Sequence, residues 1–301
     1  MRPPPLSFAG RSPRVALVLL CVAALAGCSL RFAYSQLDWL VPWYLRDYVT
    51  LDAGQRGLLD QRLAARLDWH CRAHVPEYAA SLREAQALLR RETVDAAALA
   101  PFLARGEAWW GEVLAELEPD ARLLLAGLAN AQVEELRQAF ARGAREAREA
   151  FLGGTADAQA AARLKRMEKR LQRWFGRLTP AQRDRVAAWS VELAPTTEAW
   201  LEQRARWQGA LLDALQVRGD DAAFAARLAP LFGPQQAHWP PAYREGLARN
   251  RTLTLALLAD VYNLAPATQR QRLDRELDAL AAQFETLACA APARLSAALD
   301  R

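Results

Sequence analysis

The sequence LDWLVPWYLRDY, residues 37–48, decides the fold class, because its apolar and aromatic side chains recur every three or four positions. That spacing places them on one face of an α-helix. Similar patterns continue along the chain, and no segment alternates with a period of two for long enough to predict a β-strand. We therefore expect an all-α protein, a multi-helix bundle of about nine or ten helices.

Local signals predict where these helices begin and end. Four residues have side chains that suit an N-cap: Asp52, Asp95, Thr179 and Thr196. Proline or glycine indicates breaks at five places: Val75-Pro76, Gly153-Gly154, Pro195, Gly219 and residues 232–241. We expect one helical domain over residues 37–301, with residues 153–155 as the best candidate for a boundary between two sub-bundles.

The segment Leu178-Thr179-Pro180-Ala181-Gln182 has partial echoes at residues 51–55, 117–119 and 264–266. A hydrophobic residue before an N-cap, followed by proline, is ordinary helix-start chemistry. The spacing between the copies is irregular, whereas a solenoid keeps a fixed period. These segments therefore predict helix starts in preference to a true internal repeat.

The first 27 residues have the pattern of a signal peptide, with basic residues followed by the apolar stretch 15–26. That stretch is too short to span a bilayer of roughly 30 Å as a helix. It ends in Leu25-Ala26-Gly27-Cys28, which resembles the bacterial lipobox. We expect cleavage before Cys28, lipid on its thiol, and residues 28–36 as the lipidated N-terminus and tether. A chance cysteine in an ordinary signal peptide is the alternative.

This anchor predicts the location of the protein. Several acyl chains hold a protein at a membrane without spanning it. In Gram-negative bacteria, aspartate directly after the lipidated cysteine retains a lipoprotein at the inner membrane, whereas Ser29 permits export. We expect the periplasmic face of the outer membrane. The net charge of +5 falls to about +2 without the three signal arginines, which excludes the charge pattern of nucleic-acid-binding proteins.

Because Cys21 lies in the predicted signal peptide and Cys28 is expected to carry lipid, two other cysteines, Cys71 and Cys289, remain in the predicted mature chain. An even pair in an oxidising compartment favours a disulfide. Two separately buried thiols are the alternative, because a bridge requires Cα atoms within about 7 Å of each other.

Few residues indicate chemistry. His70 and His74 have the i, i+4 spacing of metal ligands, but Cys71 stands where a His-Glu-x-x-His motif has its glutamate, and zinc needs three or four ligands. Structural or capping histidines are the favoured interpretation, and we expect no metal and no cofactor. The sequence has no Gly-x-Ser-x-Gly motif and no glycine-rich phosphate loop. Enzymatic activity is therefore unmotivated, and no catalytic residue is predicted.

Residues 163–177 form a strongly basic segment with apolar residues at helical spacing. A basic amphipathic helix can contact anionic lipid or another polyanion. The residues expected at such a contact are Arg166, Lys169, Arg170 and Arg173. The alternative is an ordinary helix that buries its apolar face and exposes its charges to water.

Several motifs, spread over most of the predicted mature chain, resemble one protein family. They are Tyr34-Ser35-Gln36-Leu37-Asp38-Trp39-Leu40, Pro42-Trp43-Tyr44, Asp47-Tyr48, Gln55, Trp69-His70, Pro76, Tyr78, Arg173-Trp174-Phe175-Gly176-Arg177-Leu178-Thr179, Gln182, Trp189, Trp200-Leu201 and Arg204. The chain resembles an uncharacterised family of proteobacterial lipoproteins, known only as a domain of unknown function. This resemblance implies an α-helical envelope lipoprotein and supplies no activity, ligand or catalytic residue.

A second resemblance covers residues 178–182 alone and is to small periplasmic stress chaperones that carry Leu-Thr-x-x-Gln motifs. The first expectation is a non-enzymatic interaction or structural protein of the cell envelope, with an envelope protein or anionic lipid as partner. Chaperone-like binding of unfolded envelope proteins is the alternative, and an envelope hydrolase is a distant third. A wide exposed apolar patch or a cleft with polar groups at its rim would separate these functions.

Overall fold

The computed structural model describes residue 34, residues 36–287 and residue 289. Every regular element in these residues is helical, which confirms the all-α class, and the number of helices is close to the nine or ten expected. In chain order the helices are α3 (Leu37–Leu45), α4 (Ala53–Ala73), α5 (Val75–Leu88), α6 (Ala96–Ala126), α7 (Asn130–Leu152), α8 (Ala156–Phe175), α9 (Pro180–Glu192), α10 (Thr197–Gln216), α11 (Asp221–Phe232), the 3-10 helix η1 (Gln235–His238), α12 (Pro241–Asn263) and α13 (Ala267–Glu285).

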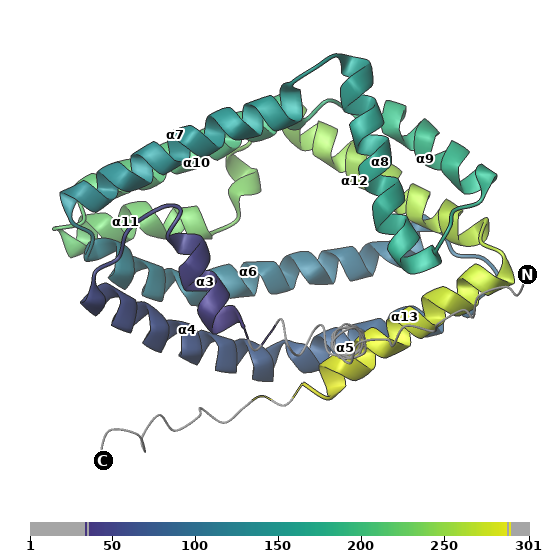
Figure 1. The fold of residues 1–301 in the computed structure, drawn as a ribbon, viewed down its shortest axis with the longest axis horizontal. Helices are drawn as coiled ribbons and strands as arrows, with labels where there is room; N and C mark the ends of the chain where they lie inside the picture. Colours follow the sequence, from purple (N-terminus) through teal and green to yellow (C-terminus); the bar gives the residue numbers. More distant parts are fainter. Residues whose placement is uncertain (1–33, 35, 288, 290–301) are drawn as a thin grey trace, which may run out of the picture.

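The helices are arranged around an elongated ring (Figure 1). α7 and α10 lie side by side along one long edge, and α4, α5 and α13 follow the other. α6 runs lengthwise and contacts α4, α11 and α12, whereas α8 and α9 pack together at one end. None of the helices in the described part of the chain is long and apolar enough to cross a membrane.

The predicted helix starts are confirmed, because Asp52, Asp95, Thr179 and Thr196 all stand directly before helices. The side chains of Asp52, Asp95 and Thr179 accept a backbone N–H there, whereas that of Thr196 makes no capping bond. The helix start expected at residues 117–119 is wrong. Proline 119 lies inside α6, which continues to Ala126. α6 packs against several other helices, and this tertiary packing outweighs the backbone hydrogen bond that an interior proline removes.

Two large hydrophobic cores hold the described helices together, besides a small cluster around the disulfide. The first includes the completely buried Val186 and Leu257 and is built mainly from α8, α9, α12 and α13. The second includes Leu215 and Phe224 and is built mainly from α7, α10 and α11. The first buried residue that the chain contributes to the first core is Val94, between α5 and α6. It then contributes α7 to the second core, α8 and α9 to the first, α10 and α11 to the second, and α12 and α13 to the first. Residues 153–155, between α7 and α8, are thus one of several crossings between the cores.

Paired glutamines join the starts of helices that are distant in sequence. Gln55 of α4 and Gln132 of α7 each donate from Nε2 to the Oε1 atom of the other, at 3.0 and 2.6 Å. The same amides donate to the backbone oxygens of Gly127 and Thr50, at 2.8 and 2.7 Å. These bonds therefore join Thr50, which precedes α4, and Gly127, which precedes α7, to the starts of both helices.

A related arrangement, with one bond between the two glutamine amides instead of two, joins the starts of α9 and α13. Gln182 donates from Nε2 to Oε1 of Gln269 at 2.8 Å and to the backbone oxygen of Val261 at 2.9 Å. Gln269 donates to the backbone oxygen of Arg177 at 2.7 Å. Both side chains are buried. The similarity between residues 51–55 and residues 178–182 therefore has two structural reasons. Both segments cap a helix, and the glutamine that ends each segment bonds to a glutamine at the start of another helix.

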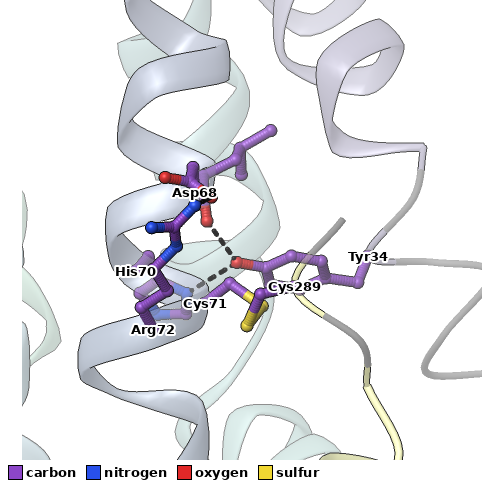
Figure 2. Close-up of a disulfide and its surroundings, with 7 residues drawn as sticks. Tyr34, Asp68, His70, Cys71, Arg72 and Cys289 are labelled. Atoms are coloured by element: carbon purple, nitrogen blue, oxygen red, sulfur yellow. Dashed lines mark hydrogen bonds and ion pairs between the residues drawn. A yellow bond between two sulfur atoms is a disulfide. The ribbon is translucent and has the colours of Figure 1, made fainter. Parts of the chain in front are cut away.

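A disulfide joins Cys71, in the last turns of α4, to Cys289, just beyond the end of α13 (Figure 2). Their Cα atoms are 5.5 Å apart, within the limit for a bridge. Cys71 is buried against Val75 and Leu287. The bridge spans 218 residues and holds the end of α4 beside the segment that follows α13.

Replacing both cysteines with serine should lower the melting temperature. Closing a loop of 218 residues contributes roughly 5 kcal/mol by chain entropy, which corresponds to a shift of about 10 °C for a domain of this size. Thermal melts of the parent and the double Cys71→Ser/Cys289→Ser variant, with and without reductant, measure this effect. Reductant should destabilise the parent only, and equal melting of all four samples would contradict a stabilising bridge.

Candidate functional site

A cavity of about 1240 Å³ lies between α5, α6, α8, α12 and α13, with η1 at one side. Its volume exceeds the roughly 300–1,000 Å³ that is common for ligand pockets. Large apolar and aromatic side chains make up most of the lining, among them Leu82, Phe102, Leu103, Trp174, Leu255 and Leu280. The cavity is therefore suited to a large apolar ligand.

The walls of the cavity come from two helix pairs. α5 packs against α13, α6 packs against α12, and α8 contacts α13 at one end. The apolar faces that these pairings leave uncovered form the lining. Leu103 and Leu258 remain more than one third exposed within it. Contiguous apolar surface of this kind is typical of a binding site.

Two polar contacts connect the walls at the edge of the cavity. Arg251 of α12 donates from Nη1 to both carboxylate oxygens of Glu107 in α6, at 2.5 and 2.6 Å. The indole N–H of Trp109 in α6 donates to Glu77 of α5 at 2.6 Å. A partly exposed ion pair contributes at most about 1 kcal/mol to stability. Both contacts nevertheless fix the distance between helices that line the cavity.

Beside the cavity lies a group of rings that we call the ring cluster: Tyr34, Trp69, His70, His74 and Tyr78. The rings of His70 and His74 stack with centroids 5.3 Å apart, and Trp69 packs edge-on against His74 at 4.8 Å. Tyr78 belongs to the cluster and to the cavity wall. The ring cluster therefore connects the surroundings of the disulfide to the cavity.

The His70 ring makes one hydrogen bond with each of its nitrogens, and the neutral form of the ring fits both. The Tyr34 hydroxyl donates its proton to the backbone oxygen of Leu67 at 2.9 Å, so it accepts from Nδ1 of His70 at 3.1 Å (Figure 2). Nε2 of His70, which then carries no proton, accepts from the Tyr78 hydroxyl at 3.0 Å. This network assigns the Nδ1–H tautomer to His70.

Burial shifts the proton equilibria of these groups. Burial, and next the neighbouring His74, lower the pKa of His70 below its ordinary value. Burial also raises the pKa of Tyr34 to about 12 and raises that of Tyr78. Both tyrosines remain protonated near neutral pH, as their hydrogen bonds require.

His70 and His74, which the sequence places at metal-ligand spacing, are held by protein groups. His74 is buried, and its Nε2 lies 3.1 Å from a carboxylate oxygen of Glu112. Within the residues that the structure describes, no three His, Cys, Asp or Glu side chains are placed to hold a metal ion. Cys71 is bonded to Cys289 and has no free thiolate to act as a nucleophile.

The basic residues expected at an anionic surface lie on one exposed face of α8. Arg166, Lys169, Arg170 and Arg173 are all exposed, and none forms an ion pair with another described residue. We call these four residues the basic stripe. The opposite face of α8 is buried in the first core through Met167, Leu171 and Phe175. The proposed lipidation site, Cys28, lies outside the described residues.

Sequence reasoning did not identify the cavity. Its lining residues are ordinary members of helical apolar faces, and their spacing indicates burial in a core. A weak signal was the concentration of large apolar side chains in α6, where Phe102, Leu103 and Trp109 all line the cavity. The sequence singled out residues of the ring cluster but did not predict their connection to a cavity.

The lowered pKa of His70 predicts acid sensitivity. The unfolded chain binds the His70 proton at higher pH than the folded chain does, so the free energy of unfolding should fall as the pH decreases below about 6.5. The neutral variant His70→Gln should lose less stability over this range. Urea denaturation at several pH values between 7.5 and 5 measures the difference, and parallel declines in both proteins would contradict it.

Comparisons with known proteins give a family and no activity. The Family of unknown function (DUF6279) matches residues 47–244, which include the two histidines of the ring cluster, the basic stripe and most of the cavity wall. No curated protein and no solved structure matches the chain. Because the match spans more than half of the sequence, the chain belongs to this family of unknown function.

Proposed function

We propose that this protein is a non-enzymatic binding protein of the bacterial cell envelope that holds an acyl chain of a lipid in its cavity. The observation that carries this proposal is the cavity itself, with its volume of about 1240 Å³ and its apolar lining. Binding sites for apolar ligands combine such a lining with a few polar groups that orient the ligand. Arg244 lines the cavity, is exposed, and has no ion-pair partner among the described side chains, so it can meet an anionic headgroup.

The proposed location rests on the sequence and on the cysteine pair. Leu25-Ala26-Gly27-Cys28 supports lipidation of Cys28, and Ser29 supports transfer to the periplasmic face of the outer membrane. The disulfide is consistent with an oxidising compartment. A protein held in this way by its acyl chains is close to a source of lipid ligands.

The basic stripe provides a second proposed contact with lipid. Its four side chains are exposed on one face of α8, whereas Leu171 and Trp174 of the same helix line the cavity. An anionic bilayer surface would satisfy charges that have no described partner. This contact should weaken as the salt concentration rises, unlike binding inside the cavity.

A charge placed inside the cavity should abolish binding of an apolar chain. Leu258→Asp introduces a carboxylate on a partly exposed wall position, where it repels the fatty-acid carboxylate and is unfavourable beside an apolar chain. The fold should survive while affinity for a fluorescent fatty acid falls at least about tenfold. Leu264→Asp is the matched control, because Leu264 is similarly exposed at the end of α12 and is not a lining residue. Fluorescence titration measures the affinities, and thermal melts verify folding.

The two variants also separate the alternatives. Equal fatty-acid affinity in the parent, Leu258→Asp and Leu264→Asp would contradict binding in the cavity. If the parent did not bind the fatty acid but prevented aggregation of an unfolded envelope protein, and Leu258→Asp lost that activity, the chaperone function would replace the lipid-binding one.

The proposed anchor predicts that Cys28→Ser abolishes acylation, because the thiol is the site of lipid attachment. Metabolic labelling with a radioactive fatty acid, followed by membrane fractionation, measures the outcome. The parent should be labelled and sediment with outer membranes, and the variant should be unlabelled. A labelled, membrane-bound Cys28→Ser protein would show that the lipobox interpretation is wrong.

A further inference from the structure

Helix α3 exposes apolar and aromatic side chains that no other described part of the protein covers. Trp39 is 60% exposed, Tyr44 54%, Trp43 45% and Leu40 41%. None of the nine residues of this helix is buried, although the sequence is apolar on most sides. A helix with this composition is normally buried in a core or in a lipid phase.

The C-terminal end of α3 is attached to the folded domain, and this attachment positions the exposed rings of Trp39 and Trp43. The rings of Trp39 and Trp43 stack with centroids 6.1 Å apart. Tyr44 and Tyr48 join their hydroxyl groups at 3.0 Å, and Tyr48 packs edge-on against Phe140 of the second core. α3 is therefore attached to the folded domain while it presents two tryptophans to the outside.

We propose that α3 lies in the headgroup region of a phospholipid bilayer, with Trp39, Leu40 and Trp43 inserted. Tryptophan and tyrosine are enriched at this depth because their rings are apolar and their N–H and O–H groups reach water. An interfacial helix of this kind buries its apolar face about 5–10 Å into the boundary between headgroups and acyl chains.

The length of the preceding chain selects the bilayer in preference to a protein partner. Leu37 follows Cys28 by nine positions, and nine residues extend at most about 30 Å. A lipid on Cys28 would therefore keep α3 close to the membrane at a high effective concentration. This step rests on the anchor proposed above, whereas the exposure and the chemistry of α3 do not.

The test uses the complete mature chain with Cys28→Ser, which cannot be anchored by acyl chains. Zwitterionic phosphatidylcholine vesicles with brominated acyl chains should bind this protein and quench part of its tryptophan fluorescence. Adding Trp39→Ala and Trp43→Ala should remove the share of the quenching that comes from these two rings and weaken vesicle binding at least about tenfold, because two buried aromatic side chains are lost. High salt should leave the binding unchanged.

Two matched variants make the result specific. Trp110→Ala removes a tryptophan of α6 that is 61% exposed, and it should bind and be quenched like the parent. A variant with glutamine at all four positions of the basic stripe should also bind zwitterionic vesicles like the parent, so loss of the α8 contact and loss of the α3 contact are distinguishable.

Three outcomes would overturn the inference. One is a parent that is neither bound nor quenched by the vesicles at any salt concentration. Another is equal binding and quenching in the parent and in the Trp39→Ala/Trp43→Ala variant. The third is a parent that does not bind vesicles but forms a dimer, while the Trp39→Ala/Trp43→Ala variant is a monomer with an unchanged melting temperature. In that case a second copy of the chain covers α3.

Discussion

The buried pair of Gln182 and Gln269 is the constraint on which the helix arrangement most depends. Gln182 is completely buried, so its amide needs protein partners for every hydrogen-bonding group, and an unsatisfied one costs about 1–3 kcal/mol. Its oxygen accepts from the N-cap N–H of Thr179, and its nitrogen donates to Val261 and Gln269. These partners are available only when α9, α12 and α13 meet at one point. The more exposed pair of Gln55 and Gln132 does the same for α4 and α7.

The helical class and the helix starts were predictable because they depend on local chemistry. Asp52 and Thr179 accept bonds from the backbone three residues on, and this requirement is visible in a short segment. The second role of the glutamines was not predictable, because it joins residues separated by 77 and 87 positions. The continuation of α6 through Pro119 was not predictable either, because it also depends on tertiary contacts. A helix supported along its length by other helices tolerates a proline that would end an isolated helix.

The candidate site shows the same division between local and tertiary information. The spacing of His70 and His74 and the charge of α8 can be seen in the sequence. A cavity is a property of surfaces that remain uncovered after the helices pair, and Leu258 differs from the core residue Leu257 only in the direction that α12 presents it. Two adjacent leucines, Leu257 and Leu258, thus belong to the core and to the cavity wall, respectively. Sequence periodicity identifies the apolar face but not the width of the space in front of it.

The ring cluster connects the N-terminal segment to the cavity wall. Tyr34 follows Cys28 by six positions, a distance of at most about 20 Å, and its hydroxyl is bonded to Leu67 and His70 of α4. His70 is bonded in turn to Tyr78, whose ring packs against Trp109 and Phe284 in the wall. The disulfide at Cys71 holds the end of α13 at the same point. If Cys28 carries a lipid, these contacts limit how far α4 and the cavity wall can lie from the membrane and how the domain can be oriented there.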